Sequence, residues 1–217
     1  MSHVVLLGDS IFDNAAYTRG GPDVIAQVRE LLPPGWRATL GAVDGATTDD
    51  FGRQVSSLPR DATHVVVSLG GNDALGHADL LDRRVRSTAE ALAALADAAE
   101  QFEKRYRRAV ASVVARDVPV TLCTIYNGSF PDAVFQRLAS TALAVFNDAI
   151  LRVAFERKLG VIDLRLICSE PNDYANPIEP SSHGGAKIAA AIVRIVELDL
   201  ELDLRRPAGG FSRVVGA

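Results

Sequence analysis

Three residues whose chemistry suits acyl transfer follow three separate apolar stretches of this sequence. Ser10 follows the run 3–8, Gly45 lies in the segment DGATT, and Asn72 lies in the segment LGGND. A serine hydroxyl can act as a nucleophile, while a backbone N–H and a side-chain amide can donate hydrogen bonds to the oxyanion that forms on attack. Glycine lets the backbone approach a substrate closely, and asparagine supplies a donor without a charge. The three residues together are typical of a nucleophile with an oxyanion site.

Each segment alone has an ordinary structural interpretation. Glycine, aspartate, serine and asparagine are common turn residues, so GDS or GGND after a strand is compatible with a simple chain reversal. The same applies to Asp9 and Asp73, which we expect to bond loop backbone. The combination of the three segments in this order, at successive strand ends, is far more specific than any one of them.

The elements that must position these residues alternate along the whole chain. Apolar, strand-like runs are expected at 3–8, 36–43, 63–73, 118–127 and 161–168. Helical spacing of apolar residues is expected at 22–33, 80–116, 131–160 (closed by Gly160) and 184–200 (capped by Ser181 or Ser182). This alternation predicts right-handed βαβ units and a parallel sheet covered on both faces. Open sheets of this kind place their sites at the carboxyl ends of the strands, where all three segments fall.

Length and composition limit the class of protein. The 217 residues, 48% of them hydrophobic, predict one domain over 1–205 followed by a Gly-rich tail over 206–217. A net charge of −4 gives no basic surface for nucleic acid. No continuous apolar run approaches the roughly 18 residues of a membrane span, and no signal peptide is recognisable, so we expect no membrane partner and a cytoplasmic location. The composition does not predict an oligomeric state.

Cofactor chemistry finds little support in the sequence. The four histidines show no paired spacing of metal ligands, which predicts no metal site. Neither a Gly-x-Gly-x-x-Gly turn nor a Gly-Lys-Ser/Thr loop follows a strand, which argues against nucleotides. Cys123 and Cys168 lie in apolar segments and are expected to be buried thiols. His77 follows GGND, where it is either a surface residue or part of a pocket.

The segments GDSI, DGATT and LGGND, in this order, resemble the first three sequence blocks of the SGNH, or GDSL-type, hydrolases. The resemblance extends over the whole chain in size and in the order of strands and helices. It implies a flavodoxin-like three-layer α/β/α fold with a five-stranded parallel sheet. It also implies hydrolysis of small carboxylic esters through an acyl-serine intermediate, with no metal or organic cofactor. In this family Ser10 would be the nucleophile, and the backbone N–H groups of Ser10 and Gly45 with the side chain of Asn72 would hold the oxyanion.

The fourth block of the family departs from its pattern in this chain. The family has Asp-x-x-His before the last helix, with the histidine as general base. When the segment is aligned on Gly184 at the helix start, Asn176 and Glu179 occupy the positions of the aspartate and the histidine. The nearest histidine, His183, comes four residues later.

Three interpretations of this departure compete. In the first, Glu179 removes the proton of Ser10, which requires burial to raise its pKa from the usual value near 4.3. In the second, the loop rearranges and His183 reaches Ser10, oriented by Asp173 or Glu179, with its better matched pKa in its favour. In the third, the site is catalytically impaired and the pocket only binds a small ligand. His183 as an exposed residue of the first helical turn, and Glu179 as a partner of backbone N–H groups, are the purely structural alternatives.

Overall fold

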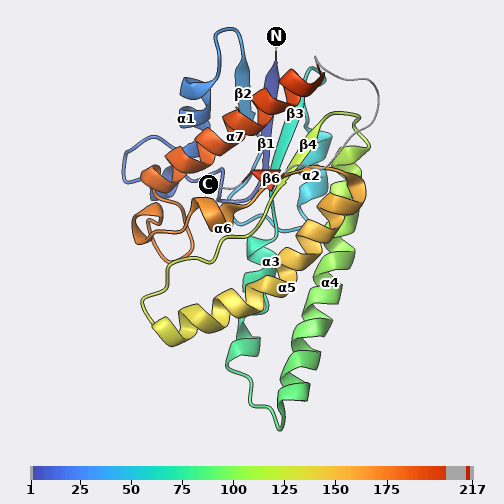
Figure 1. Ribbon diagram of the computed structural model, residues 1–217, viewed down its shortest axis with the longest axis vertical. Coiled ribbons are helices and arrows are strands. Elements are labelled where there is room, and N and C mark those ends of the chain that lie inside the picture. Colours follow the sequence, from blue (N-terminus) through green and yellow to red (C-terminus); the bar gives the residue numbers. More distant parts are fainter. Residues whose placement is uncertain (1, 204–213, 216–217) are drawn as a thin grey trace.

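The computed structural model describes residues 2–203 and 214–215 as a parallel sheet between two layers of helices (Figure 1). The strand order is β2-β1-β3-β4-β5-β6, and every neighbouring pair is parallel. The strands are β1 His3–Gly8, β2 Arg37–Leu40, β3 His64–Ser68, β4 Val120–Cys123, β5 Gly160–Ile162 and β6 Val214–Val215. The flavodoxin-like α/β/α prediction is confirmed. The sheet exceeds the five expected strands by β6, a two-residue edge strand that falls within the predicted tail and pairs with β5.

The helices are divided between the two faces of the sheet. They are α1 Val24–Leu31, α2 Phe51–Ser56, α3 Gly71–Leu75, α4 Thr88–Val114, α5 Ala133–Arg157, α6 Leu164–Ile167 and α7 Ser182–Asp203, with short 3₁₀ turns η1 Ala15–Tyr17, η2 Ala78–Leu81 and η3 Pro171–Asp173. Val4 and Leu6 pack with α1, α6 and α7 on one face, whereas Val5 and Leu7 pack with α2, α4 and α5 on the other. Successive strand residues point to opposite faces, which explains why β1 is apolar throughout.

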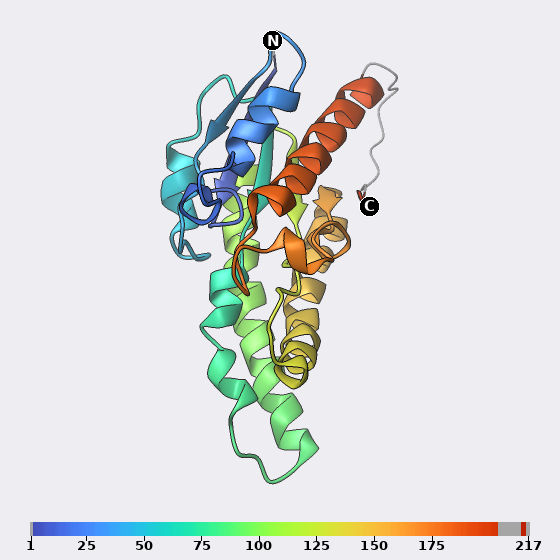
Figure 2. The ribbon, with the colours of Figure 1, turned by 90° about the vertical axis from the view of Figure 1, so that its left-hand side faces the viewer.

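Helices α4 and α5 extend well past the carboxyl ends of the strands. Figures 1 and 2 show the two helices side by side, with α3 near them below the sheet. Two ion pairs join the helices, Arg107 with Glu156 and Arg152 with Glu103. The extension gives the carboxyl edge of the sheet a helical wall that the expected strand and helix order did not suggest.

Helix α5 has the length and apolar composition of a membrane span, although we expected no such stretch. In the structure it packs against α4 and the sheet, and its inner side chains, such as Phe146 and Ile150, are buried. Length and composition alone do not separate a core helix from a membrane helix, so this feature is weak grounds for a membrane role.

Several predicted boundaries are wrong. The runs 36–43, 63–73 and 118–127 form the shorter strands β2, β3 and β4, and residues 71–73 belong to α3. Three further boundaries differ for a local reason. The run 161–168 leaves the strand after Ile162, because the Asp163 side chain accepts the backbone N–H of Arg165 and begins α6. The expected helix 80–116 begins only at Thr88, where the side chain of Ser87 caps it.

The end of α5 differs from the prediction as well. The helix ends in a left-handed Lys158 (φ 57°) and not at Gly160, which instead starts β5. A side chain at residue 160 would come within 2.7 Å of Thr121 on the neighbouring strand, so close strand packing explains this glycine. The predicted cap of the last helix is confirmed, since Ser181 Oγ accepts the N–H of Gly184 at 3.1 Å.

Candidate active site

Ser10 is placed by a sharp turn at the end of β1. Gly8 has φ +129°, and a side chain there would collide with the backbone carbonyl of Ser68 on β3. The side-chain amide of Gln54 fixes this turn by bonding both the N–H and the carbonyl of Gly8, each at 2.7 Å. The chain therefore leaves the sheet abruptly and brings Ser10 to the carboxyl edge, where it is only 7% exposed.

The loops that carry Gly45 and Asn72 are tied to the Ser10 loop and to each other. Asp13 Oδ2 accepts the backbone N–H of Asp44 at 2.9 Å, and Asn72 Nδ2 donates to the carbonyl of Ala46 at 3.0 Å. Gly45 (φ +77°) lies between these two tie points. The structure thus brings the three predicted segments to one edge of the sheet.

The aspartates beside these residues bond loop groups, as predicted. Asp9 Oδ1 accepts the N–H of Ile11 at 3.2 Å. Asp73 accepts both the backbone N–H and the hydroxyl of Thr48. Asp73 therefore holds the loop after Gly45 against α3, which further fixes the arrangement of the two segments.

Glu179 contacts Ser10 directly. The Ser10 hydroxyl donates a hydrogen bond of 3.1 Å to Glu179 Oε1, across 169 residues of sequence. Glu179 is 6% exposed, and its second oxygen, Oε2, is buried without a hydrogen-bond partner among the described residues. Buried carboxylate oxygens are normally satisfied, so this atom has the environment of a group that exchanges a proton.

The conformation of Glu179 is set through its backbone. Asn176 Oδ1 accepts the N–H groups of both Ile178 and Glu179, at 2.9 and 3.0 Å. Tyr126 donates its hydroxyl proton to the carbonyl of Ile178 at 2.6 Å, and Asn14 Nδ2 donates to the carbonyl of Pro180 at 3.3 Å. Asn176 is therefore an anchor of the Glu179 turn through the backbone.

The electrostatic setting favours proton exchange near neutral pH. Burial raises the pKa of Glu179 to about 7, the negative charge of Asp44 adds to the rise, and the hydrogen bond from Ser10 opposes it. Burial likewise raises the pKa of Asp9 to about 7, where the N–H of Ile11 opposes the rise and the charge of Glu179 adds to it. A base with a pKa near the working pH is well matched to general acid–base catalysis.

His183 lies in a different cluster at the start of α7. Its Nε2 is 3.7 Å from Asp173 Oδ1, and its side chain is 59% exposed. The buried Asp173 carboxylate also accepts the N–H of Glu170 at 2.9 Å and pairs with Lys187 Nζ at 2.8 Å. The described residues that line the cavity beside Ser10 include Glu179 but not His183. The rearrangement that would bring His183 to Ser10 is thus not the conformation of this structure.

The same cluster is the one place where the described side chains could gather around a metal ion. Ligand atoms of Glu170, Asp173 and His183 lie within 4.8 Å of one another. The ammonium of Lys187 already lies against Asp173, where it supplies the positive charge that a cation would bring. The donor set is therefore that of an ion-pair cluster.

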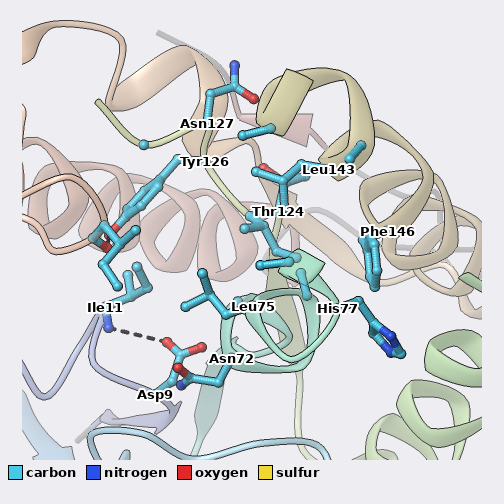
Figure 3. A pocket seen from close by; sticks show the side chains of 18 of the residues that line it. Asp9, Ile11, Asn72, Leu75, His77, Thr124, Tyr126, Asn127, Leu143 and Phe146 are labelled. Atoms are coloured by element: carbon cyan, nitrogen blue, oxygen red, sulfur yellow. Dashed lines mark hydrogen bonds between the residues drawn. The ribbon is translucent and has the colours of Figure 1, made fainter. Parts of the chain in front are cut away.

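An apolar cavity of about 120 Å³ opens beside Ser10 and Glu179. Figure 3 shows Asp9 and Asn72 at one end of it and His77 and Phe146 at the other. Of the two alternatives expected for His77, a surface position or a place in the pocket, the structure shows the second. One wall of this cavity was not predicted from the sequence. It lies on α5 and is formed by residues at helical spacing: Ala139, Ala142, Leu143 and Phe146. This apolar stripe on α5 is the sequence signal that could have indicated the cavity wall.

Comparisons with known proteins agree with this fold. Residues 6–186 match the model of the GDSL-like lipase/acylhydrolase family. The fold is similar to that of an extracellular lipase from Streptomyces rimosus (17% identity, TM-score 0.66, covering 91% of this chain and 99% of that one). It is also similar to a phospholipase A1 from Streptomyces albidoflavus NA297 (17%, 0.64, 91% and 98%) and to the acetyl xylan esterase AlAXEase (19%, 0.66, 89% and 99%). A comparison with curated proteins found no match.

The sheet, the turn after β1 and the three linked loops form a site at the carboxyl edge of a parallel α/β sheet. The chain belongs to the GDSL-like lipase/acylhydrolase family, whose model covers its segments from β1 to the start of α7.

Proposed function

We propose that this protein is a serine esterase that hydrolyses carboxylic esters through an acyl-Ser10 intermediate, with Glu179 as the general base. The observation that carries the proposal is the 3.1 Å hydrogen bond from Ser10 Oγ to Glu179 Oε1. The distance is within the range of a nucleophile and its base. The raised pKa of Glu179 supplies what an ordinary carboxylate lacks.

In the first half of the reaction, Ser10 Oγ attacks the ester carbonyl carbon while its proton passes to Glu179. The negative charge that develops on the carbonyl oxygen is stabilised by the N–H groups of Ser10 and Gly45 and by the amide of Asn72. When the C–O bond to the alcohol breaks, Glu179 returns the proton to the departing oxygen, which leaves the acyl-enzyme.

In the second half, Glu179 takes a proton from water as the water oxygen attacks the acyl carbon. The second tetrahedral species collapses, the proton returns to Ser10 Oγ, and the carboxylic acid leaves. Each half begins and ends with the same protonation state of Glu179, so the cycle needs no external acid or redox partner.

The ligand-binding alternative to catalysis has no observation in its favour in the described part of the chain. A ligand-binding pocket would not require the buried, unpartnered oxygen of Glu179 beside a serine hydroxyl. An ester hydrolase uses both groups.

The test is hydrolysis of p-nitrophenyl acetate by the native protein and by Ser10→Ala, with covalent labelling by a fluorophosphonate read by intact mass. We expect Ser10→Ala to lose about 10⁴-fold or more in kcat and all labelling. The exposed serine that directly follows α2, Ser57, gives the matched control Ser57→Ala, which should keep both turnover and labelling. Unchanged turnover in Ser10→Ala would overturn the nucleophile.

A further inference from the structure

The two sides of Ser10 differ sharply in polarity. On one side lies the apolar cavity, whose walls come from α3, α4, α5 and the loop that follows Ser10 and include Ile11, Leu75, Leu95, Phe135, Leu143 and Phe146. Outside the cavity lining, Tyr17 donates its hydroxyl proton to Asp44 at 2.7 Å, and the Asp13 side chain accepts the backbone N–H of the same residue. The charge of Asp44 is close enough to Glu179 to raise its pKa. An ester held at Ser10 is therefore close both to apolar walls and to a carboxylate-rich loop.

Aromatic side chains lie at the end of the cavity away from Asp9 and Asn72. His77 and Phe146 meet there with their ring centroids 6.1 Å apart (Figure 3). Ala139 and Ala142 on α5 face the same space, and their short side chains leave it open. Apolar cavities of comparable size, about 150 Å³, hold a ligand as large as benzene. The space beside Ser10 is therefore much larger than an acetyl group needs.

We propose that this cavity takes the acyl chain of the ester, so that the substrates are esters of medium-chain carboxylic acids, of about the length of hexanoate to octanoate. The proposal rests on the proposed esterase function and names its substrate class. The alcohol half leaves on the side of Tyr17, Asp13 and Asp44. A charged or polar acyl group would lose its hydration against the apolar walls, so such acyl groups are excluded.

The gain per methylene sets the expected size of the effect. Each CH₂ removed from water into an apolar site increases kcat/KM by about fourfold until the chain meets the far wall. The profile over p-nitrophenyl acetate, butyrate, hexanoate, octanoate and dodecanoate should therefore rise, peak at hexanoate or octanoate, and fall for dodecanoate.

A pair of isomeric esters separates the acyl side from the alcohol side. Methyl heptanoate and hexyl acetate have the same atoms, but the long chain lies on opposite sides of the ester bond. We expect methyl heptanoate to be hydrolysed at least about tenfold faster at subsaturating concentration, because only its acyl chain enters the cavity. Faster hydrolysis of hexyl acetate would assign the cavity to the alcohol and overturn the proposal.

Variants on α5 test which residues limit the length of the substrate's acyl chain. Ala142→Phe fills the cavity and should lower the octanoate-to-acetate ratio of kcat/KM by about tenfold or more. Ala144→Phe on the same helix is the matched control, because Ala144 is exposed and does not line the cavity. Leu143→Ala enlarges the space and should move the peak toward longer chains, which keeps the test valid if Ala142→Phe does not fold.

The outcomes separate this inference from the proposed function. A native profile that peaks at acetate, or equal ratios in Ala142→Phe and Ala144→Phe, would overturn the acyl-chain assignment while the esterase function stands. No turnover of any of these esters, together with no fluorophosphonate labelling of Ser10, would overturn the esterase function and the substrate class with it.

Discussion

Glu179 and His183 lie close together in sequence, yet the structure gives them opposite environments. Glu179 is buried, accepts a hydrogen bond from the Ser10 hydroxyl, and keeps one oxygen without a partner among the described residues. His183 is mostly exposed and faces Asp173, whose carboxylate is already paired with Lys187. The comparison teaches that position matters more than residue type, because the buried Glu179, and not His183, contacts Ser10.

The largest expected difference between Glu179 and His183 is in the catalytic rate. Glu179→Gln keeps the shape of the side chain but cannot accept the Ser10 proton, so kcat for p-nitrophenyl acetate should fall by about 10² to 10⁴-fold. His183→Gln is the matched variant and should leave the rate unchanged. Stopped-flow or steady-state release of p-nitrophenol measures both. The reverse pattern would make His183 the base and require the loop to rearrange in solution.

The two residues should also differ in their effect on the pH dependence of stability. The folded protein holds Glu179 with a pKa near 7, whereas the unfolded chain titrates this group near 4.3, so the folded state binds more protons between these values. The stability that depends on protonated Glu179 is therefore complete below about pH 4 and is lost as the pH rises through about 7.

Urea unfolding at several pH values measures this linkage. Relative to that of the native protein, the free energy of unfolding of Glu179→Gln should increase by on the order of 2 kcal/mol from about pH 5 to pH 8, because glutamine does not ionise. His183→Gln should follow the native pH dependence. If the free energies of unfolding of Glu179→Gln and of the native protein depend on pH in the same way, burial does not raise the pKa of Glu179.

A smaller effect distinguishes the side chains that anchor the two candidates. Asn176→Ala removes the acceptor of two N–H groups in the Glu179 turn and should lower kcat/KM by about tenfold through misplacement of the carboxylate. Asp173→Asn weakens the His183 and Lys187 cluster and should lower the melting temperature without changing kcat. Equal losses of kcat in both variants would show that the two clusters are not independent.

Much of the fold could be predicted from the sequence because its signals are local. Strands such as 3–8 are apolar on both faces, which is typical of a parallel sheet covered by helices. The errors arose where one polar side chain ended an apolar pattern. Asp163 ended the predicted strand 161–168 after Ile162 and began a short helix, and the helix predicted to end at Gly160 ended at Lys158.

The candidate site could be predicted only in part, for a related reason. Ser10, Gly45 and Asn72 follow strand ends, so the topology alone brings them to one edge of the sheet. The choice between Glu179 and His183 depends on an irregular loop, held by Asn176 and by distant contacts that no periodic pattern reveals. The apolar wall on α5 was present in the sequence as a helical stripe, but its partner across the cavity comes from elements far along the chain.

The most direct test of the central claim is the pH dependence of kcat/KM for p-nitrophenyl acetate in His183→Gln. If Glu179 accepts the Ser10 proton, activity in this variant still rises with pH, with a midpoint near 7, because the carboxyl must be ionised to act as a base. Since an ordinary histidine titrates near 6.5, the native profile alone would not separate the two bases. Loss of the rise in His183→Gln, with the rise intact in Glu179→Gln, would contradict the account.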